Sequence, residues 1–199
     1  MAKSAWCTVN PTEGSGNKTV NVSGETHTGR TARQTTLTIT AANVEPVTVQ
    51  VNQAGKPEFV NSQDTAAVVK DGQVLTISGK SNSRKLTFSL GTGTLEMELP
   101  ATYIANSLTV NNGEEISGDP GTASEYDFSI QFTVARNESI TDLTRQLVVT
   151  DEGGHTDTCL IRQAAGDPTL SVSKNTIELD YLGTAQSFEV ISNSNWSIK

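Results

Sequence analysis

Apolar and polar residues alternate along most of this 199-residue chain. In one stretch Phe128, Ile130, Phe132 and Val134 are separated by Ser, Gln and Thr. Such a period of two places apolar side chains on one face of a strand and polar side chains on the other. The same pattern predicts further strands at residues 19–22, 37–40, 47–51, 86–90 and 95–99. We therefore expect strands with one buried face along the whole chain.

Turn-forming pairs separate these strands at intervals of roughly ten residues. They include Asn10-Pro11, Asp71-Gly72, Asp119-Pro120 and Gly153-Gly154. We find no convincing helical pattern. Short strands with frequent turns are typical of β-sandwiches, and one immunoglobulin-type sandwich needs about 100 residues. The sequence predicts an all-β fold of tandem immunoglobulin-like β-sandwich modules, partial at both ends.

An internal repeat sets the module boundaries. Residues 33–55 and 145–166 each begin with Arg-Gln, form a strand-turn-strand pattern, and close with Gln-Ala-Gly or Gln-Ala-Ala-Gly. Each copy is followed by a proline, Pro57 or Pro168, and by new strand signals, as at a linker between modules. We expect the back half of one module at 1–55, a complete module at 57–166, and the front half of another at 168–199.

The two ends also resemble each other, since Ser4-Ala5-Trp6 matches Ser194-Asn195-Trp196. Residues 169–196 followed by 7–55 would make one uninterrupted module. A half sandwich exposes strand edges and an apolar face that need a partner. The ends could dock into neighbouring subunits, close on each other within one chain, or belong to a longer molecule. For strand exchange between subunits, the candidate residues are Trp6, Val9, Trp196 and Ile198.

Charge and cysteine content narrow the classes of partner and compartment. The net charge of −8 and scattered basic residues argue against nucleic acid and anionic membranes as partners. Cys7 and Cys159 fall in different modules, so we expect buried free thiols. No apolar run follows Lys3, and we expect either a chain that is used without export or one whose signal was removed.

The sequence offers no convincing catalytic, metal or cofactor site, and we expect a protein that is not an enzyme. His27 and His155 lie in polar turns, where solvated histidines are common, and no further ligands accompany the pair His155 and Cys159. The adjacent carboxylates are predicted to lie on turns and to point apart into water, unlike the facing pair of a glycosidase. These carboxylates are Glu114-Glu115 and Asp151-Glu152.

Aromatic side chains are the usual platforms for sugar rings, but they make up only 5% of this chain. Tyr103, Tyr126 and Tyr181 are the candidates, although packing at the edge of a core explains them as well. For Trp6 and Trp196 we expect core positions, because sandwich cores normally hold such a tryptophan.

Both terminal pieces resemble the BACON family, a Bacteroidetes-associated immunoglobulin-like repeat. The resemblance rests on the two tryptophan strands, on Gln53-Ala54-Gly55, and on the segments 170–172, 177–179 and 187–190. The middle module fits only in its last third, and its insertion at 95–119 departs from the pattern. The resemblance implies a sandwich fold. It also implies a bacterial surface protein with glycan or mucin ligands, or a virion protein of crAss-like gut phages.

Two functions follow as hypotheses. The first is a virion structural protein, a capsid decoration or head-fibre component that assembles with its own copies or with capsid proteins on the capsid surface. The alternative is an extracellular carbohydrate-binding, mucin-binding or adhesion module of a Bacteroidetes surface protein. An export signal upstream or measurable binding of mucin glycans would favour the alternative. Because one sandwich fold serves many roles, the fold itself does not decide between them.

Overall fold

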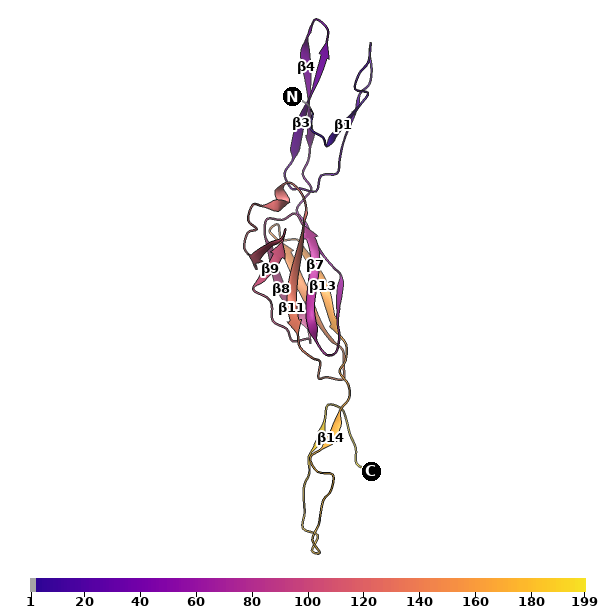
Figure 1. The fold of residues 1–199 in the computed structure, drawn as a ribbon, viewed down its shortest axis with the longest axis vertical. Coiled ribbons are helices and arrows are strands. Elements are labelled where there is room, and N and C mark those ends of the chain that lie inside the picture. Colours follow the sequence, from indigo (N-terminus) through magenta and orange to yellow (C-terminus); the bar gives the residue numbers. More distant parts are fainter. Residues whose placement is uncertain (1–2) are drawn as a thin grey trace.

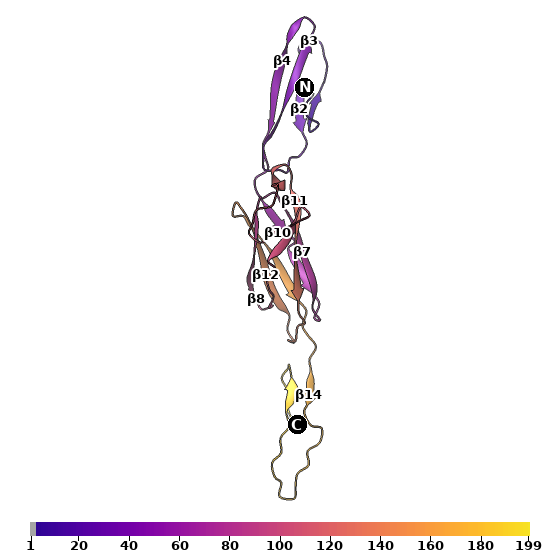
Figure 2. The ribbon, with the colours of Figure 1, turned by 60° about the vertical axis from the view of Figure 1, so that its left-hand side comes forward.

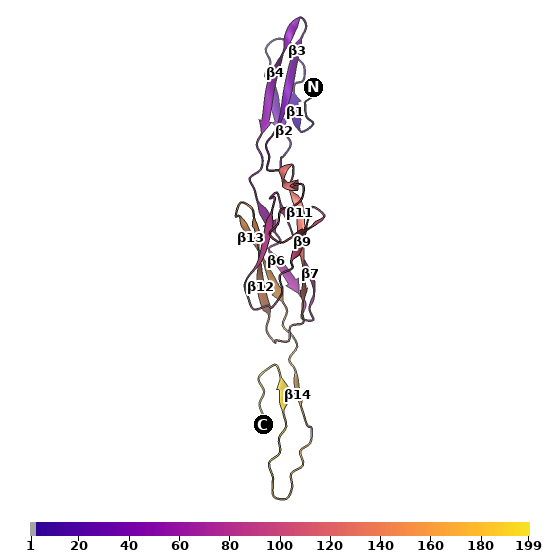
Figure 3. The ribbon, with the colours of Figure 1, turned by 90° about the vertical axis from the view of Figure 1, so that its left-hand side faces the viewer.

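The structure is a computed structural model that describes residues 3–199. The chain forms three parts in a line (Figure 1), which we name the N-terminal segment (residues 3–55), the central sandwich (57–166) and the C-terminal segment (168–199). The two terminal segments lie at opposite ends of the central sandwich in each view of the ribbon (Figure 2 and Figure 3). Of the three alternatives for the ends, closure on each other within one chain does not occur in this arrangement.

The central sandwich consists of two sheets. One has the strand order β10-β9-β11-β7-β5 and the other the order β6-β13-β12-β8. Its strands are β5 (Val60–Ser62), β6 (Thr65–Val68), β7 (Gln73–Ser81), β8 (Leu86–Gly93), β9 (Thr102–Ala105), β10 (Leu108–Asn111), β11 (Tyr126–Val134), β12 (Leu143–Asp151) and β13 (Thr156–Gln163). All pairs are antiparallel except β6 with β13. Because the chain changes sheets between β5 and β6, the topology is that of an immunoglobulin-like sandwich, and the predicted fold class is confirmed.

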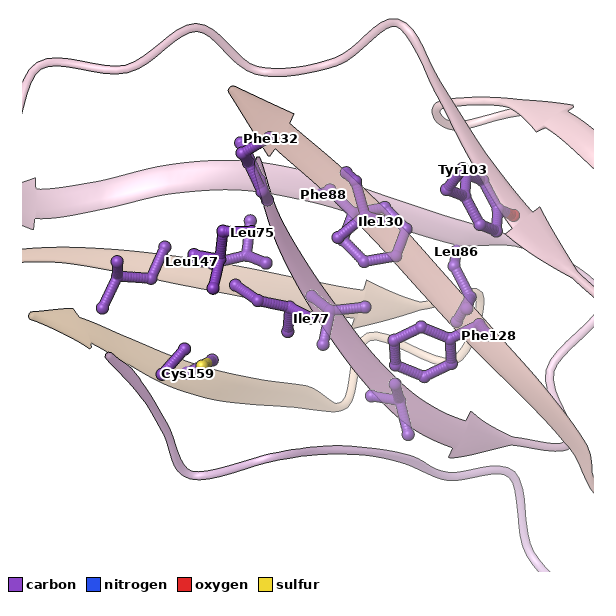
Figure 4. Close-up of a cluster of buried hydrophobic side chains, with 14 of the residues drawn as sticks. Leu75, Ile77, Leu86, Phe88, Tyr103, Phe128, Ile130, Phe132, Leu147 and Cys159 are labelled. Atoms are coloured by element: carbon purple, nitrogen blue, oxygen red, sulfur yellow. The ribbon is translucent and has the colours of Figure 1, made fainter. Parts of the chain in front are cut away.

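The core lies between these sheets and takes the apolar face of each alternating strand. The alternate residues of β11, from Phe128 to Val134, are all buried, and Phe88 packs its ring 4.9 Å from the ring of Tyr103 and 5.7 Å from that of Phe128 (Figure 4). Cys159 on β13 is buried in the same core, as Figure 4 shows. Both Cys7 and Cys159 are free and buried, which confirms the prediction for the cysteines.

One predicted strand is wrong. Residues 95–99 alternate correctly, since Leu95 is buried and Met97 and Leu99 pack against the core, yet the segment is irregular. The ladder between β8 and β12 shifts register at Arg145–Leu147, and both Thr94 and Leu95 donate their N–H to the carbonyl oxygen of Thr144. The chain beyond this bulge has apolar contacts but no neighbouring strand with which to form a ladder.

The N-terminal segment contains two separate two-stranded sheets. β1 (Cys7–Asn10) pairs with β2 (Asn21–Gly24), and β3 (Arg33–Ala41) pairs with β4 (Val44–Gln53). Among the described strands β4 pairs only with β3. The corresponding strand of the central sandwich is β13, because β4 and β13 end at the repeated Gln-Ala sequence, at Gln53 and Gln163. β13 pairs with β12 on one side and with β6 on the other. The outer edge of β4 is thus an open strand edge.

The C-terminal segment is sparse. β14 (Leu170–Val172) pairs with β15 (Val190–Ser192), and most of the residues between them are irregular. The segment nevertheless repeats the start of the central sandwich, because β14 matches β5 and β15 matches the end of β7. The turn before β7 contains Gly72 at φ 78, and the corresponding Gly183 has φ 71, so the same left-handed glycine precedes both strands.

Candidate binding surfaces and module junctions

A buried asparagine holds the N-terminal segment to the central sandwich. Asn82 directly follows β7, and its side-chain amide donates to the carbonyl oxygens of Thr28, Lys56 and Pro57 at 3.2–3.3 Å. Its Oδ1 accepts the N–H of Phe59 at 3.0 Å. Asn82 has no exposed surface, so a single amide satisfies main-chain groups from both sides of the boundary. We call this boundary junction 1.

The boundary between the central sandwich and the C-terminal segment, junction 2, repeats this arrangement. Asn193 directly follows β15, and its amide donates to the carbonyl oxygens of Glu138 and Asp167 at 3.0 and 2.9 Å. Its Oδ1 accepts the N–H of Thr169 at 2.8 Å. The two asparagines therefore perform the same role at both ends of the central sandwich.

Serines complete the match between the junctions. Ser81 donates its hydroxyl to the carbonyl oxygen of Phe59 at 2.7 Å, and Ser192 does the same to Thr169 at 2.7 Å. Each serine Oγ also accepts the N–H of the serine two residues later, at 2.9 and 3.1 Å. The sequence Ser-Asn-Ser at 81–83 and at 192–194 thus forms one hydrogen-bonded unit in two places.

Junction 1 has further contacts from the loop that contains the short 3-10 helix η1 (Pro120–Thr122). The N–H groups of Arg30 and Thr31 donate to the carbonyl oxygens of Gly121 and Thr122 at 2.9 and 3.1 Å. The Arg30 guanidinium also forms an ion pair with Asp119. This loop therefore stabilises junction 1 with contacts that add to those of Asn82.

The ion pair at junction 1 changes the acidity of Asp119. Partial burial favours the neutral acid, but hydrogen bonds from Arg30 and Thr122 and the positive charge of Arg30 together outweigh burial and lower the pKa of Asp119. Nearby, a hydrogen bond from Lys56 is the main cause of the lowered pKa of Glu125. Both carboxylates are thus held in the charged form by cations at the boundary.

An open apolar face is the main surface feature of the N-terminal segment. A groove of about 710 Å³ runs between the β1–β2 pair and the β3–β4 pair, and Val9, Val20, Val22, Ile39 and Val49 contribute to its lining. Ile39 is 53% exposed, whereas Val149, at the matching position of β12, is 1% exposed. The groove therefore exposes apolar positions whose counterparts in the central sandwich are buried.

The C-terminal segment exposes the complementary set of side chains. Leu179 is 59% exposed, whereas Val68, at the matching position of β6, is 3% exposed. Phe188 and Leu170 are also exposed, although their counterparts Ile77 and Val60 are buried in the central core. Apolar positions that are buried in the central sandwich are therefore exposed in this segment.

The residues proposed for strand exchange fall into two pairs that lie far apart. Trp6 and Val9 are half-buried in the N-terminal segment, with the Arg33 guanidinium 4.6 Å above the Trp6 ring, and Val9 lines the groove. Trp196 and Ile198 lie beyond β15 in the opposite segment and are largely exposed. The expectation that Trp196 lies in a core is wrong in this chain, because no strands cover it.

The tyrosines differ in their surroundings. Tyr103 and Tyr126 are buried in the central core, and Tyr126 donates its hydroxyl to the carbonyl oxygen of Ser83 at 2.7 Å. Burial raises the pKa of Tyr103 and of Tyr126 above the ordinary value for tyrosine. Tyr181 is 96% exposed in the turn before β15, so it alone of the three can meet a ligand in solution.

The acidic and histidine side chains considered above as catalytic or metal-binding candidates stabilise a turn or form surface ion pairs. We expected Asp151 to point into water, but it is buried, accepts the main-chain N–H of His155 at 2.8 Å, and lies 2.8 Å from the Nδ1 of the same residue. The expectation fails because Asp151 closes the turn between β12 and β13 from inside. Glu115 and Glu152 both pair with Arg84 at the surface.

His27 lies at junction 1, with its Nε2 2.7 Å from the carbonyl oxygen of Thr31. Within residues 3–199 there is no group of three or more His, Cys, Asp or Glu side chains that could hold a metal ion. Burial is the main cause that raises the pKa of the Cys159 thiol to about 11.

Sequence reasoning missed Asn82 and Asn193, the residues that organise both junctions. Asparagine is common in loops, and neither residue belongs to an apolar pattern. The signal was nevertheless present, since Ser-Asn-Ser occurs after the second long strand pattern of the middle module and again near the C-terminus.

Comparison with protein families gives a match for the N-terminal part of the chain. Residues 1–54 match the BACON family, which is described as a putative binding domain, N-terminal. No curated protein matches the chain. In the part of the chain that the structure describes, no helix combines the length and apolarity needed to cross a membrane.

Two of the solved structures that resemble this chain are distant likenesses. One is a protein from Bacteroides thetaiotaomicron studied by NMR, with 14% identity, a TM-score of 0.28, and coverage of 56% of this chain and 90% of that one. The other is protocadherin gamma B2 extracellular cadherin domains 1–5, with 12% identity, a TM-score of 0.37, and coverage of 98% of this chain. The chain spans 39% of that cadherin chain.

Proposed function

We propose that this chain is a non-catalytic section of an extended, Bacteroidetes-type surface protein that holds immunoglobulin-like binding modules in line. The observation that carries the proposal is the repeated junction. At each end of the central sandwich, one asparagine amide and one serine hydroxyl form equivalent hydrogen bonds across the boundary. Boundaries between loosely linked modules usually carry few contacts. A junction that repeats the same hydrogen bonds at both ends of the central sandwich instead favours a straight spacer that keeps binding surfaces away from the surface that carries it.

The match of residues 1–54 to a putative binding domain supports a ligand-binding role. Carbohydrate, including mucin glycans, is the ligand class that we propose, with Tyr181 as the contact residue. Tyr181 matches Lys70 of the central sandwich, which lies in the turn between β6 and β7. Its ring would therefore stay in solvent even in a completed module, whereas Leu179, two residues earlier, matches the buried Val68.

Binding of the full chain to mucin O-glycans tests this function, first on a glycan array and then by titration calorimetry. Tyr181→Ala is expected to weaken binding by about tenfold, equivalent to ~1.4 kcal/mol. Tyr181→Phe keeps the ring and should bind like the parent chain. Equal affinity of Tyr181→Ala and the parent, or no binding to any glycan, would contradict the carbohydrate proposal.

The virion role stays a prediction, because neither the family match nor the distant structural likenesses bear on capsids or phage particles. An outer-surface location fits the Bacteroidetes association and is part of the proposal. A direct check is localisation of the native protein with antibodies to this chain on intact cells and on purified phage particles.

A further inference from the structure

The groove of the N-terminal segment and the exposed face of the C-terminal segment are complementary halves of one sandwich. The strands β2, β3 and β4 match β11, β12 and β13, which close the central module. The equivalence extends to side chains, because Gln53 donates its Nε2 to the carbonyl oxygen of Glu25 at 2.8 Å, and Gln163 does the same to Ala135 at 2.7 Å. The correspondence does not extend to β1, which pairs with β2, whereas β8 pairs with β12.

The C-terminal segment matches the strands β5, β6 and β7, which open the central module. What the N-terminal segment lacks is therefore what the C-terminal segment carries. We propose that the C-terminal segment of one copy of this chain seats on the N-terminal segment of a second copy and completes a sandwich between them. This inference does not depend on which ligand the protein binds.

The central sandwich provides the template for the contact. There β6 pairs in parallel with β13, and Ala67 lies opposite Arg162 and Val68 opposite Gln163. Transferred to the matching residues, Glu178 of one copy lies opposite Asn52 of the next, and Leu179 lies opposite Gln53. The edge of β4 that receives this strand is open in the structure. Main-chain hydrogen bonds would thus provide affinity, as in other cases of strand addition.

Apolar side chains determine the register of this contact. A shift of one residue would turn Leu179 away from the groove, because alternate residues of a strand face opposite sides. In the register taken from β6 and β13, Leu179 and Phe188 occupy the positions of Val68 and Ile77. Both of those residues belong to the hydrophobic core of the central sandwich. Val20, Ile39 and Val49, now exposed, would be covered in return.

Charge favours this pairing over contact through the middle of the molecule. The N-terminal segment has four basic and three acidic residues, and the C-terminal segment has two basic and three acidic residues. The segments therefore carry about +1 and −1, and the net charge of −8 of the whole chain resides in the central sandwich. Two nearly neutral, oppositely charged segments meet without the repulsion that two central sandwiches would experience.

Geometry directs the contact to another molecule and sets the form of the assembly. The two segments lie at opposite ends of the central sandwich (Figure 1), so one chain in this arrangement does not complete itself. The contact joins two different surfaces, head to tail, and such an interface generates an open filament unless its rotation closes a ring. Because the two junctions repeat the same hydrogen bonds, each added copy continues along the axis of the previous one.

Mixing two variants that each carry one introduced cysteine tests the register, and the native Cys7 and Cys159 are both buried. Chains with Glu178→Cys and chains with Asn52→Cys are mixed under mild oxidation, since paired Cα atoms in adjacent strands fall within the range of about 4.4–6.8 Å that a disulfide spans. We expect a covalent dimer from the mixture and little from either variant alone. The matched control replaces Asn52→Cys with Thr109→Cys, an exposed strand position on β10, and should give no dimer.

Light scattering and electron microscopy test the assembly itself. The parent chain is expected to form concentration-dependent oligomers and filaments, and Val49→Asp, which places a charge in the groove, should reduce them to monomers. Val74→Asp, at an exposed apolar site of the central sandwich, serves as the control and should assemble like the parent. An unchanged melting transition of the central sandwich in each variant excludes a failure to fold.

A circularly permuted chain distinguishes the proposed contact from nonspecific association. Residues 57–196 followed by 7–55 place both halves of the second module in one chain, and this chain should be a monomer with two closed sandwiches. A parent chain that stays monomeric at high concentration, or a permuted chain that still polymerises, would overturn the proposal. The glycan titration of Tyr181 variants does not enter either result, so the two proposals fail separately.

Discussion

At the scale of single residues, the molecule depends on side chains that satisfy main-chain groups at points where strands end. The main chain at each junction has carbonyl oxygens and one N–H that no neighbouring strand satisfies. The side-chain amides of Asn82 and Asn193 form the hydrogen bonds that these groups would otherwise form with water. Asp151 performs the same task in the turn between β12 and β13. None of these residues belongs to an alternating apolar pattern, so their roles are visible in the folded structure and not in that pattern.

Asn82→Ala should destabilise junction 1, because it leaves up to three carbonyl oxygens and the N–H of Phe59 without partners in a buried site. Each unsatisfied buried group costs about 1–3 kcal/mol, although relaxation lets water recover part of this. We expect faster hydrogen exchange at residues 28–31 and 56–59, measured by mass spectrometry. Asn61→Ala, on the exposed side of β5, is the control, and equal exchange in the two variants would contradict the role of Asn82.

At the scale of elements, alternation identified most strands and their buried faces. The strands from Leu86, Phe128, Leu37 and Val47 were predicted on the correct segments, since each has one face on a core or on an open groove. The segment 95–99 shows the limit of the argument. Alternation reports which side chains are buried, but a strand also needs a neighbour for its main chain, and that neighbour comes from the topology.

Phe88→Ala should weaken the central sandwich more than any surface change, because the ring of Phe88 packs between Tyr103 and Phe128. Removal of a buried aromatic ring costs about 3–5 kcal/mol in comparable cores. Urea unfolding followed by tyrosine fluorescence measures the loss as a lower midpoint with little change in slope. Thr87→Ala, the exposed neighbour, should change stability by less than about 0.5 kcal/mol.

At the scale of the whole molecule, three parts lie in a line, and their order along the axis was not predictable from the sequence. The repeat between the terminal pieces predicts that each is part of a module, and this division of the chain stays a prediction. Three arrangements of the ends remained open, because apolar patterns do not say whether a missing partner is near or far. Contacts of Asn82 and Asn193 at junction 1 and junction 2 hold the terminal segments at opposite ends of the central sandwich, which excludes only their closure on each other within this chain.

The pH dependence of the shape follows from the acids at junction 1. The pKa values of Asp119 and Glu125 are lowered in the folded chain, so their contribution is complete above the unfolded values of about 3.9 and 4.3 and is lost as pH falls through the lower folded values. Distances between spin labels on β4 and β8 should stay constant from pH 7 to about pH 5 and broaden below about pH 4.

Asp119→Asn is the matched variant for this measurement. It removes the ion pair with Arg30, so its label distances should already be broader at pH 7 and change less on acidification. Broadening in the parent between pH 7 and pH 5, where both carboxyls stay charged, would point to other groups.

The side-chain amides of the junction asparagines donate only to main-chain carbonyl oxygens: those of Thr28, Lys56 and Pro57 at one boundary, and those of Glu138 and Asp167 at the other. Carbonyl oxygens are common to every amino acid, so a joint of this kind tolerates sequence drift on the side it grips. Gene duplication or recombination can then exchange, add or delete repeats without matching substitutions at the positions whose carbonyl oxygens the asparagines bind. Length becomes a property that selection can adjust in whole units, while each unit remains free to diversify its outer surface.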